Sequence, residues 1–208
     1  GLRRMYKEME SVFFYITTMN ENYQQPEMPK GVEIDIVKGM YLLEDGGAGE
    51  YKLTKPLNKD ARLRLLGSGT ILREVRKAAE ILRKEYSVAV DVWSVTSFNE
   101  LRRDALAVSR ENMLCPDKKP KLPFVTEKLA KQKGPIIAAT DYMKAYSDQI
   151  REFVPDSYRV LGTDGFGRSD SRERLRHFFE VDSKFVVLAA LTDLKELGLV
   201  DPKAILAH

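Results

Sequence analysis

The stretch ARLRLLGSGTILREVRKAAEILRKEYSVAVDVWSV, residues 61–95, decides the fold of this chain. It opens with arginine and leucine in alternation, which predicts a β-strand. After a glycine-containing turn, apolar residues recur every three or four positions between Ile71 and Leu82, as on one face of a helix. Residues 88–95 are apolar almost throughout, which is typical of a parallel strand covered on both faces. The stretch therefore predicts two parallel strands joined by a helical, right-handed crossover.

The same alternation of strands and helices continues on both sides of this unit. A short helical turn and a strand around residues 40–44 precede it. A helix follows it, at whose start Ser97 and Glu100 form a capping box that satisfies backbone donors. The remaining expected elements are a short helix over 126–134, a strand over 135–140, a helix from Asp141 to about Phe153, a strand over 157–162 and two final helical segments. This order predicts an α/β fold of three layers, with a mostly parallel sheet of about five strands and flanking helices.

The two ends of the chain have a different character. The apolar run that starts at Val12 predicts a buried strand extending to Thr18, and the linker NENYQQPEMPKG after it indicates a domain boundary. Near the other end, Asp201 suits an N-cap and Pro202 a first helical position, but only about one and a half helical turns follow. We therefore expect a fragment of a longer polypeptide, with residues 45–60 as a glycine- and lysine-rich loop or hairpin within it.

The composition is that of a globular, charge-rich chain. Of the 208 residues, 43% are apolar, and the net charge is only +3. The basic residues are interleaved with glutamates and prolines, which argues against a nucleic-acid-binding face. A single cysteine excludes an internal disulfide framework and fits a reducing compartment. No apolar run reaches the roughly 18 residues of a membrane span, and no signal-peptide pattern is present. We therefore expect a cytoplasmic chain with no membrane or nucleic-acid partner.

The first candidate site is Gly67-Ser68-Gly69-Thr70, between a predicted strand and a predicted helix. Backbone amides at such a helix start can hold a phosphate. However, residue 72 is leucine where a dinucleotide-binding G-x-G-x-x-G motif has its third glycine, and the lysine of a P-loop is missing. A strand-to-helix turn requires glycine in either case, so the sequence favours a tight turn over a nucleotide site.

Cys115, at a helix end before Pro116, is the second candidate. A catalytic thiol needs a base and an electropositive environment. The chain has two histidines, one of which is its last residue. A passive cysteine is therefore favoured, and no metal site of three or four soft ligands can be assembled. We predict no catalytic, cofactor-binding or metal-binding residue in this chain.

The third candidate is RVLGTDGFGRSDSRERLRHFF, residues 159–179. Its glycines allow a tight path after a strand, at the carboxyl end where α/β sheets place ligand and partner contacts. Asp170 is expected to cap the next helix, with Glu173 at the third position. No nucleophile–base pair is evident, so an interface or structural loop is favoured over a catalytic one. The candidate interface residues are Asp164, Phe166, Arg168, Ser169, Asp170, Arg172 and His177.

Several segments together resemble a known family: GLRRMYKEMESVFFYITTMNENY, LLGSGTILREVRKAAEIL, VWSVTSFNELRRD, TDYMKAYSDQIREFVP and YRVLGTDGFGRSDSRERLRHFFEVD. They are similar, in order and over nearly the whole chain, to the C-terminal third of the homodimeric, bacterial-type pyruvate dehydrogenase first component. The resemblance implies a transketolase C-terminal-like domain over residues 31–208, truncated at its C-terminus. Residues 1–30 would be the tail of the preceding pyrimidine-binding domain plus a linker.

The resemblance also implies an activity, cofactors and partners. The full-length enzyme oxidatively decarboxylates pyruvate with thiamine diphosphate and magnesium, and passes the acetyl group to lipoyl on the acyltransferase component. The fragment alone is expected to be inactive and to bind neither cofactor. It would serve dimerisation, support of the neighbouring domains and approach of the acyltransferase. Its expected partners are the other domains of the subunit, a second copy in a homodimer and the acyltransferase, in the cytoplasm of a bacterium.

Two positions depart from the family pattern: Gln24 and Cys115 stand where relatives often have histidine. No role is assigned to either. Two alternatives to the enzyme fragment remain, namely a free-standing, non-catalytic binding module of the same fold and the C-terminal domain of another thiamine-dependent enzyme. The run TDGFGRSDSRE argues against the second, because those relatives keep only a looser glycine–serine pattern there.

Overall fold

The centre of the molecule is a five-stranded sheet. The computed structural model describes residues 1–16, 18, 21–46, 58–201, 203 and 205. The strand order is β1-β3-β2-β4-β5. β1 runs antiparallel to β3, whereas the other neighbouring strands are parallel. The mostly parallel sheet expected from the sequence is thus confirmed. The strands are β1 Met40–Glu44, β2 Asn58–Gly67, β3 Val88–Val95, β4 Ile136–Ala139 and β5 Tyr158–Leu161.

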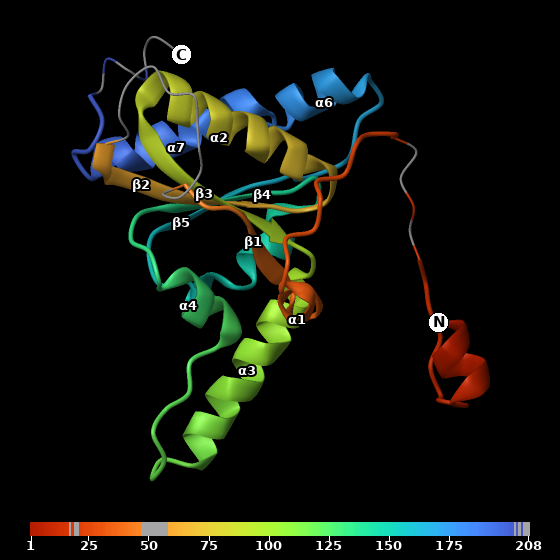
Figure 1. The fold of residues 1–208 in the computed structure, drawn as a ribbon. Helices are drawn as coiled ribbons and strands as arrows, with labels where there is room; N and C mark the ends of the chain where they lie inside the picture. The colour runs from red at the N-terminus through yellow and green to blue at the C-terminus, as the bar shows by residue number, and fades with distance from the viewer. Residues whose placement is uncertain (17, 19–20, 47–57, 202, 204, 206–208) are drawn as a thin grey trace.

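Helices cover both faces of this sheet, which makes three layers (Figure 1). On one face, α2 and α7 pack together and close an apolar core against β2 and β3. On the other face, α3 and α4 close a second apolar core that includes Trp93 and Phe98. The three-layer prediction is confirmed. The helices are α1 Glu33–Lys38, α2 Leu72–Tyr86, α3 Phe98–Leu114, α4 Phe124–Leu129, α5 Lys144–Asp148, α6 Arg172–Phe178 and α7 Ser183–Glu196.

The alternation in β2 sends its side chains to opposite faces, as a period of two requires. Leu63 and Leu65 enter the core under α2 and α7, and both are fully buried. Arg64 points to the other face, where it is also fully buried. Its guanidinium donates to the carbonyls of Leu129 and Gly134, and to Asp156. The arginines of the alternating pattern therefore lie on a face of β2 that is covered by other elements and supplies hydrogen-bond acceptors. They do not lie on a solvent-exposed face.

The turn from β2 into α2 depends on its glycines. A Cβ atom on Gly67 would lie 2.8 Å from the Cα of Leu72, closer than real Cβ atoms come. Gly69 has a φ of +56°, a conformation that side chains disfavour. The backbone thus needs both glycines for steric reasons alone, which supports the tight-turn interpretation of this segment.

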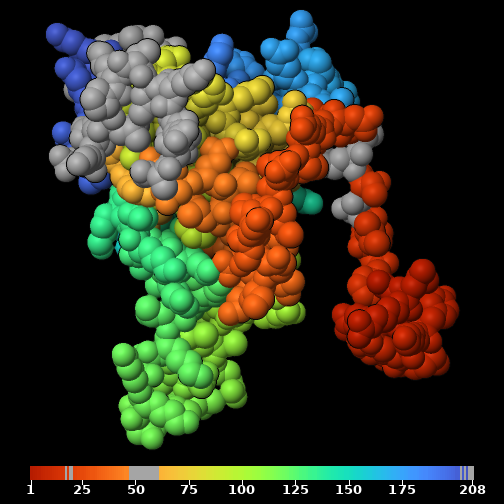
Figure 2. Space-filling view, in the orientation of Figure 1, coloured from red at the N-terminus to blue at the C-terminus, as the bar shows by residue number. Residues whose placement is uncertain are grey.

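Capping explains the start of α3, and packing explains its course. Ser97 Oγ accepts a hydrogen bond from the amide of Glu100 at 3.1 Å, which confirms Ser97 as the N-cap. The reciprocal half of the predicted capping box is missing, because the amide of Ser97 donates to the carbonyl of Gly39 at 3.0 Å and Glu100 pairs with Arg103. Only the first half of the helix is buried, at Phe98, Leu101 and Ala105. The second half and the loop after it project from the body as an arm (Figure 2).

Two predicted elements were wrong. Residues 12–16 and 18 form no strand, and the side chains of Phe13 and Tyr15 are exposed to 85% and 87%. A strand needs hydrogen-bonded neighbours, and no described strand lies beside this segment. It follows a short π-helical turn, Arg3–Lys7, and the two form a lobe apart from the sheet (Figure 2).

The helix expected from Asp141 to Phe153 is broken into α5 and a 3-10 turn over Arg151–Phe153. α5 begins at Lys144 and not at Asp141, because the carbonyl of Tyr142 accepts the amide of Thr163 at 2.8 Å and is not available to a helix. It breaks at Ile150, whose side chain is fully buried.

Two further predictions fall at the edge of what the structure describes. The expected loop or hairpin over residues 45–60 lies largely outside the described residues. At the C-terminal end, Asp201 Oδ1 accepts the amide of Lys203 at 2.8 Å, which is the geometry of an N-cap, while most of the predicted helix lies outside the described residues. None of the described helices is long and apolar enough to cross a membrane.

Candidate functional site

The candidate site lies at the carboxyl edge of the parallel strands. From β2 the chain crosses to β3, and from β4 it moves to β5 on the opposite side. The boundary between β2 and β4 is therefore a topological switch point, where open α/β sheets form a crevice. Across it, the buried Ser68 hydroxyl donates to Thr140 Oγ1 at 2.8 Å. Thr70 Oγ1 reaches Asp141 Oδ2 at 3.5 Å. These contacts hold the loops after β2 and β4 together.

The loop after β5 has a rigid base. A Cβ atom on Gly162 would lie 2.7 Å from the carbonyl oxygen of Tyr142, so no larger residue fits there without moving the chain. One residue later, Thr163 donates its amide to that carbonyl. Asp164 Oδ1 then accepts the amide of Lys144 at 3.0 Å. Asp164 therefore ties its own loop to the start of α5, a contact within the chain.

Beyond this base the loop is open to solvent. Phe166 is 98% exposed, and its neighbours Arg168 and Ser169 are exposed as well. The guanidinium carbon of Arg168 lies 4.3 Å from the ring centroid of Phe178, a cation–π contact that orients the arginine. An apolar ring displayed beside an oriented arginine is typical of protein interfaces.

The N-cap of α6 is Ser171 and not Asp170. Ser171 Oγ accepts the amide of Arg174, while Asp170 Oδ1 accepts the amide of Ser171 at 2.7 Å. Both residue types cap helices well, and the correct one is adjacent to the predicted one. Asp170 lies 3.9 Å from Arg174, a weak ion pair at the surface.

His177 lies at the end of α6, away from the exposed loop. Its Nδ1 is 3.0 Å from Asp182 Oδ2, and its ring centroid is 5.3 Å from that of Phe185. Asp182 also caps α7 by accepting the amide of Phe185 at 3.0 Å. His177 therefore contributes to the junction between α6 and α7.

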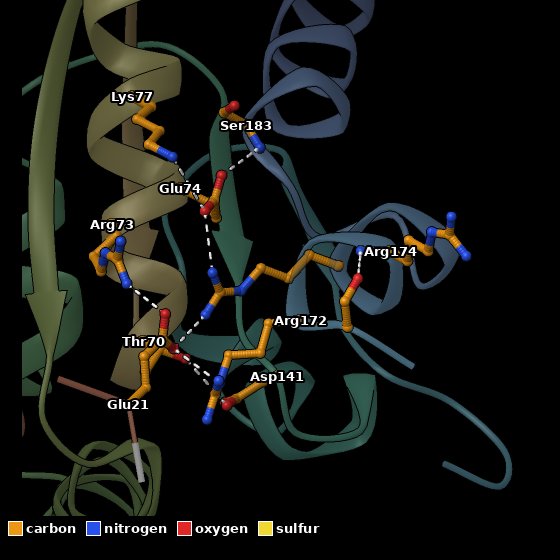
Figure 3. A network of polar contacts seen from close by, with 11 residues as sticks. Glu21, Thr70, Arg73, Glu74, Lys77, Asp141, Arg172, Arg174 and Ser183 are labelled. Carbon is orange, nitrogen blue, oxygen red and sulfur yellow. Dashed lines mark hydrogen bonds and ion pairs between the residues drawn. The ribbon is translucent and has the colours of Figure 1, made fainter. Parts of the chain in front are cut away.

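A carboxylate that no sequence pattern indicated organises this region (Figure 3). Glu21 lies in the segment before α1, and its side chain is only 14% exposed. It accepts from Arg73 of α2 at 2.6 Å and from Arg176 of α6 at 2.7 Å. Arg172 approaches the same carboxylate to 3.6 Å. Three arginines thus fix one residue of the segment before α1 to two helices.

The charge of Glu21 is stabilised by these partners. Burial on its own raises the pKa of Glu21, but the hydrogen bonds and charges of Arg176 and Arg73 outweigh it. The pKa of this carboxyl group is therefore held below its ordinary value. The group stays ionised throughout the neutral range and keeps its arginines in place.

Glu74 extends the network to α7. It accepts the amide of Ser183 at 3.2 Å and lies 3.5 Å from Arg176. The sequence did hold a signal here, because Glu74 falls beside the apolar stripe of α2, where a buried carboxylate requires partners. Nothing in the sequence connects residues 21 and 176, since they are far apart in the chain.

The described residues offer no place for metal chemistry. No three His, Cys, Asp or Glu side chains among them are grouped so that they could hold a metal ion. Cys115 is half-buried at the end of α3, where its amide donates to the carbonyl of Glu111 at 3.0 Å. Gln24 is exposed.

Comparisons with known proteins agree with this architecture. The model of the "Transketolase-like TK C-terminal domain" family matches residues 49–182. The "Pyruvate dehydrogenase E1 component" of Pseudomonas aeruginosa is 56% identical over 208 residues, and that of Escherichia coli K12 is 52% identical over 209 residues. Each match covers 99% of this chain and 22% of the relative. A transketolase from Leishmania mexicana superposes with a TM-score of 0.49 at 18% identity, over 83% of this chain and 20% of that one.

The family match extends over more than half of the chain and includes β2 to β5, the switch point and the loop after β5. The chain spans about a fifth of the length of the curated relatives it matches. It belongs to the transketolase-like C-terminal domain family.

Proposed function

We propose that this chain is the C-terminal part of a pyruvate dehydrogenase E1 subunit. That subunit would oxidatively decarboxylate pyruvate and transfer the acetyl group to lipoyl on the acyltransferase component of a complex. The support is the identity of 56% to the E1 component of P. aeruginosa along 99% of this chain. Residues 1–30 would be the tail of the pyrimidine-binding domain and a linker, and residues 31–208 the C-terminal domain.

In this proposal the reaction takes place outside the described residues. Thiamine diphosphate supplies stabilisation of the carbanion, and the protein supplies binding and orientation. In this proposal the chain alone would be inactive and bind neither cofactor. Its contribution would be to support the other domains, to complete a homodimer and to guide the acyltransferase, all in the cytoplasm of a bacterium.

The loop after β5 is the proposed contact surface. One observation carries the proposal: Phe166 is 98% exposed at the tip of a loop whose base is fixed by Gly162 and Asp164. A rigid loop presents an apolar side chain at little conformational cost, which favours binding. The proposed contact residues are Phe166, Arg168, Ser169 and Arg172 at the surface, with Asp164, Asp170 and His177 holding the loop and α6 in shape.

The test uses the full-length subunit with Arg168 and Arg172 both changed to alanine. We expect weaker dimerisation, or a loss of overall flux with the acyltransferase, while decarboxylation assayed with an artificial acceptor is retained in whatever dimer remains. Arg174→Ala is the matched control, because Arg174 lies on the same helix and its side chain is 79% exposed. Sedimentation gives the association constant. Association and flux equal to those of the control would refute the interface.

A further inference from the structure

A small pocket lies on the face of the sheet that α1, α3 and α4 cover (Figure 1). Its volume is about 290 Å³, near the lower end of the range for small-molecule sites, roughly 300–1,000 Å³. Strands β2 and β3 contribute Arg64, Asp91 and Trp93 to its lining. α1 contributes Asp35, and the turn after α4 contributes Lys131. We refer to this cavity as the Trp93 pocket.

Two buried donors in the lining of the Trp93 pocket have no acceptor. The indole Nε1 of Trp93 and the guanidinium Nε of Arg64 are closed to solvent, and neither has a hydrogen-bond partner in the part of the chain that the structure describes. Trp93 is 6% exposed and Arg64 is fully buried. Buried donors without a partner are costly and rare in folded proteins. Since both residues line the pocket, an acceptor inside it would supply the partner that they lack.

One positive charge of the lining is available to a ligand. Most of the charged groups there are already paired: Asp91 accepts from Arg62 at 2.6 Å, and Lys128 of α4 pairs with Asp35 of α1. Lys131 differs from them, because it is exposed and makes no hydrogen bond or ion pair with the rest of the described chain. A ligand with a single negative charge can pair with Lys131 without breaking an existing contact.

The Trp93 pocket also offers apolar surface. Val32 and Leu42 line it together with the indole ring of Trp93. Apolar walls that carry a few polar groups are the usual make-up of a small-molecule site. A hydrated inorganic ion would leave these walls uncovered, whereas a short organic chain would cover them.

We infer that the Trp93 pocket binds a small organic acid that carries a second, uncharged acceptor such as a ketone carbonyl. Lys131 holds the carboxylate. The carbonyl accepts from the indole N–H of Trp93, which a small turn of the ring presents to the pocket. The chain between the two groups rests on Val32 and Leu42. The inference does not depend on the enzyme-subunit proposal, because it rests only on residues of this chain.

Trp93 is the only tryptophan of the chain, so its fluorescence reports on this pocket alone. The 208-residue chain, whose two apolar cores close within it, is titrated with three probes at constant ionic strength. Levulinate carries a ketone and a carboxylate, pentanoate lacks the ketone, and methyl levulinate lacks the charge. Levulinate is expected to change the emission saturably. Pentanoate should bind about tenfold more weakly, since it leaves a buried donor unpaired, and methyl levulinate about threefold more weakly, since a pair with an exposed lysine is modest.

Variants separate the two contacts. Lys131→Ala should weaken levulinate binding by about threefold, whereas Lys133→Ala, exposed in the same segment but outside the lining, should leave it unchanged. In Trp93→Phe, followed by calorimetry, levulinate should lose its advantage over pentanoate.

Three results would overturn the inference. The first is equal affinity of the wild type for levulinate and pentanoate, or an advantage of levulinate that persists in Trp93→Phe. The second is an equal effect of the two lysine variants. The third is the absence of saturable levulinate binding by both fluorescence and calorimetry, which would leave ordered water as the partner of Trp93.

Discussion

At the scale of single residues, Glu21 does the most to define the region around the loop after β5. It lies in the segment before α1, yet its carboxylate is the common acceptor of arginines from α2 and α6. Removing one partner of a shielded charge pair is costly, because the others stay behind without their counter-charge. Glu21 is therefore a main contact that holds the segment before α1 against α2 and α6.

Glu21→Gln should lower the free energy of unfolding by about 1.5–3 kcal/mol at pH 7, since hydrogen bonds to charged groups contribute in that range. The measurement is urea denaturation followed by circular dichroism. Glu173→Gln on the exposed surface of α6 is the control for loss of a negative charge. A deficit no larger than that of the control would mean that the segment before α1 is not held by Glu21.

The loss of stability caused by Glu21→Gln should depend on pH in a defined way. The pKa of Glu21 is lower in the folded chain than its ordinary value of about 4.3. Its stabilisation is therefore fully present above that value and is lost as pH falls through the folded pKa. The difference in stability between the wild type and Glu21→Gln should be constant from pH 8 to about pH 5. It should narrow as the pH falls below about 4.

At the scale of elements, the start of α6 depends on a choice between two adjacent N-cap residues. The sequence offers Asp170 and Ser171 in succession, and both are good N-caps. The structure chooses Ser171, whose hydroxyl accepts the amide of Arg174, and gives Asp170 the amide of Ser171. Local preference cannot distinguish the two, because they are adjacent in the chain and both residue types are favoured at the N-cap.

Ser171→Ala should destabilise the chain by about 1 kcal/mol, the usual cost of losing an N-cap. Asp170→Ala should cost less than half as much, since Asp170 makes only a local turn contact and a weak ion pair. The two variants are compared by urea denaturation in the same buffer. The reverse order of stabilities would restore Asp170 as the cap.

Elsewhere, regular patterns predicted the elements and long-range contacts decided the exceptions. The strand at residues 88–95, the helix after it and the cap at Ser97 were all readable from local sequence, and they are confirmed. The strand expected from Val12 was wrong because an apolar run needs a partner as well as a pattern. The helix expected over residues 141–153 was wrong because Tyr142 pairs with a loop more than twenty residues away.

At the scale of the whole molecule, the sheet brings together groups that no local pattern joins. The carboxyl ends of β2, β4 and β5 place the loops at Thr70, Asp141 and Thr163 around one cavity. The exposed loop with Phe166 leaves the same edge. The sequence predicted that edge as a contact region through residues 159–179. It could not predict Glu21 or the burial of Arg64, because their partners are distant in the chain.

The central proposal is that this domain works as one part of a much larger enzyme subunit. The match covers 99% of this chain but only 22% of its relatives, which bear the name of such a subunit. The most direct test is the mass of the native polypeptide that carries this sequence, measured by immunoblot of the source cells with an antibody against the chain. We predict a band several times larger than 23.7 kDa. A native band at 23.7 kDa would contradict the proposal and would leave a free-standing binding module, with the loop after β5 as its contact surface.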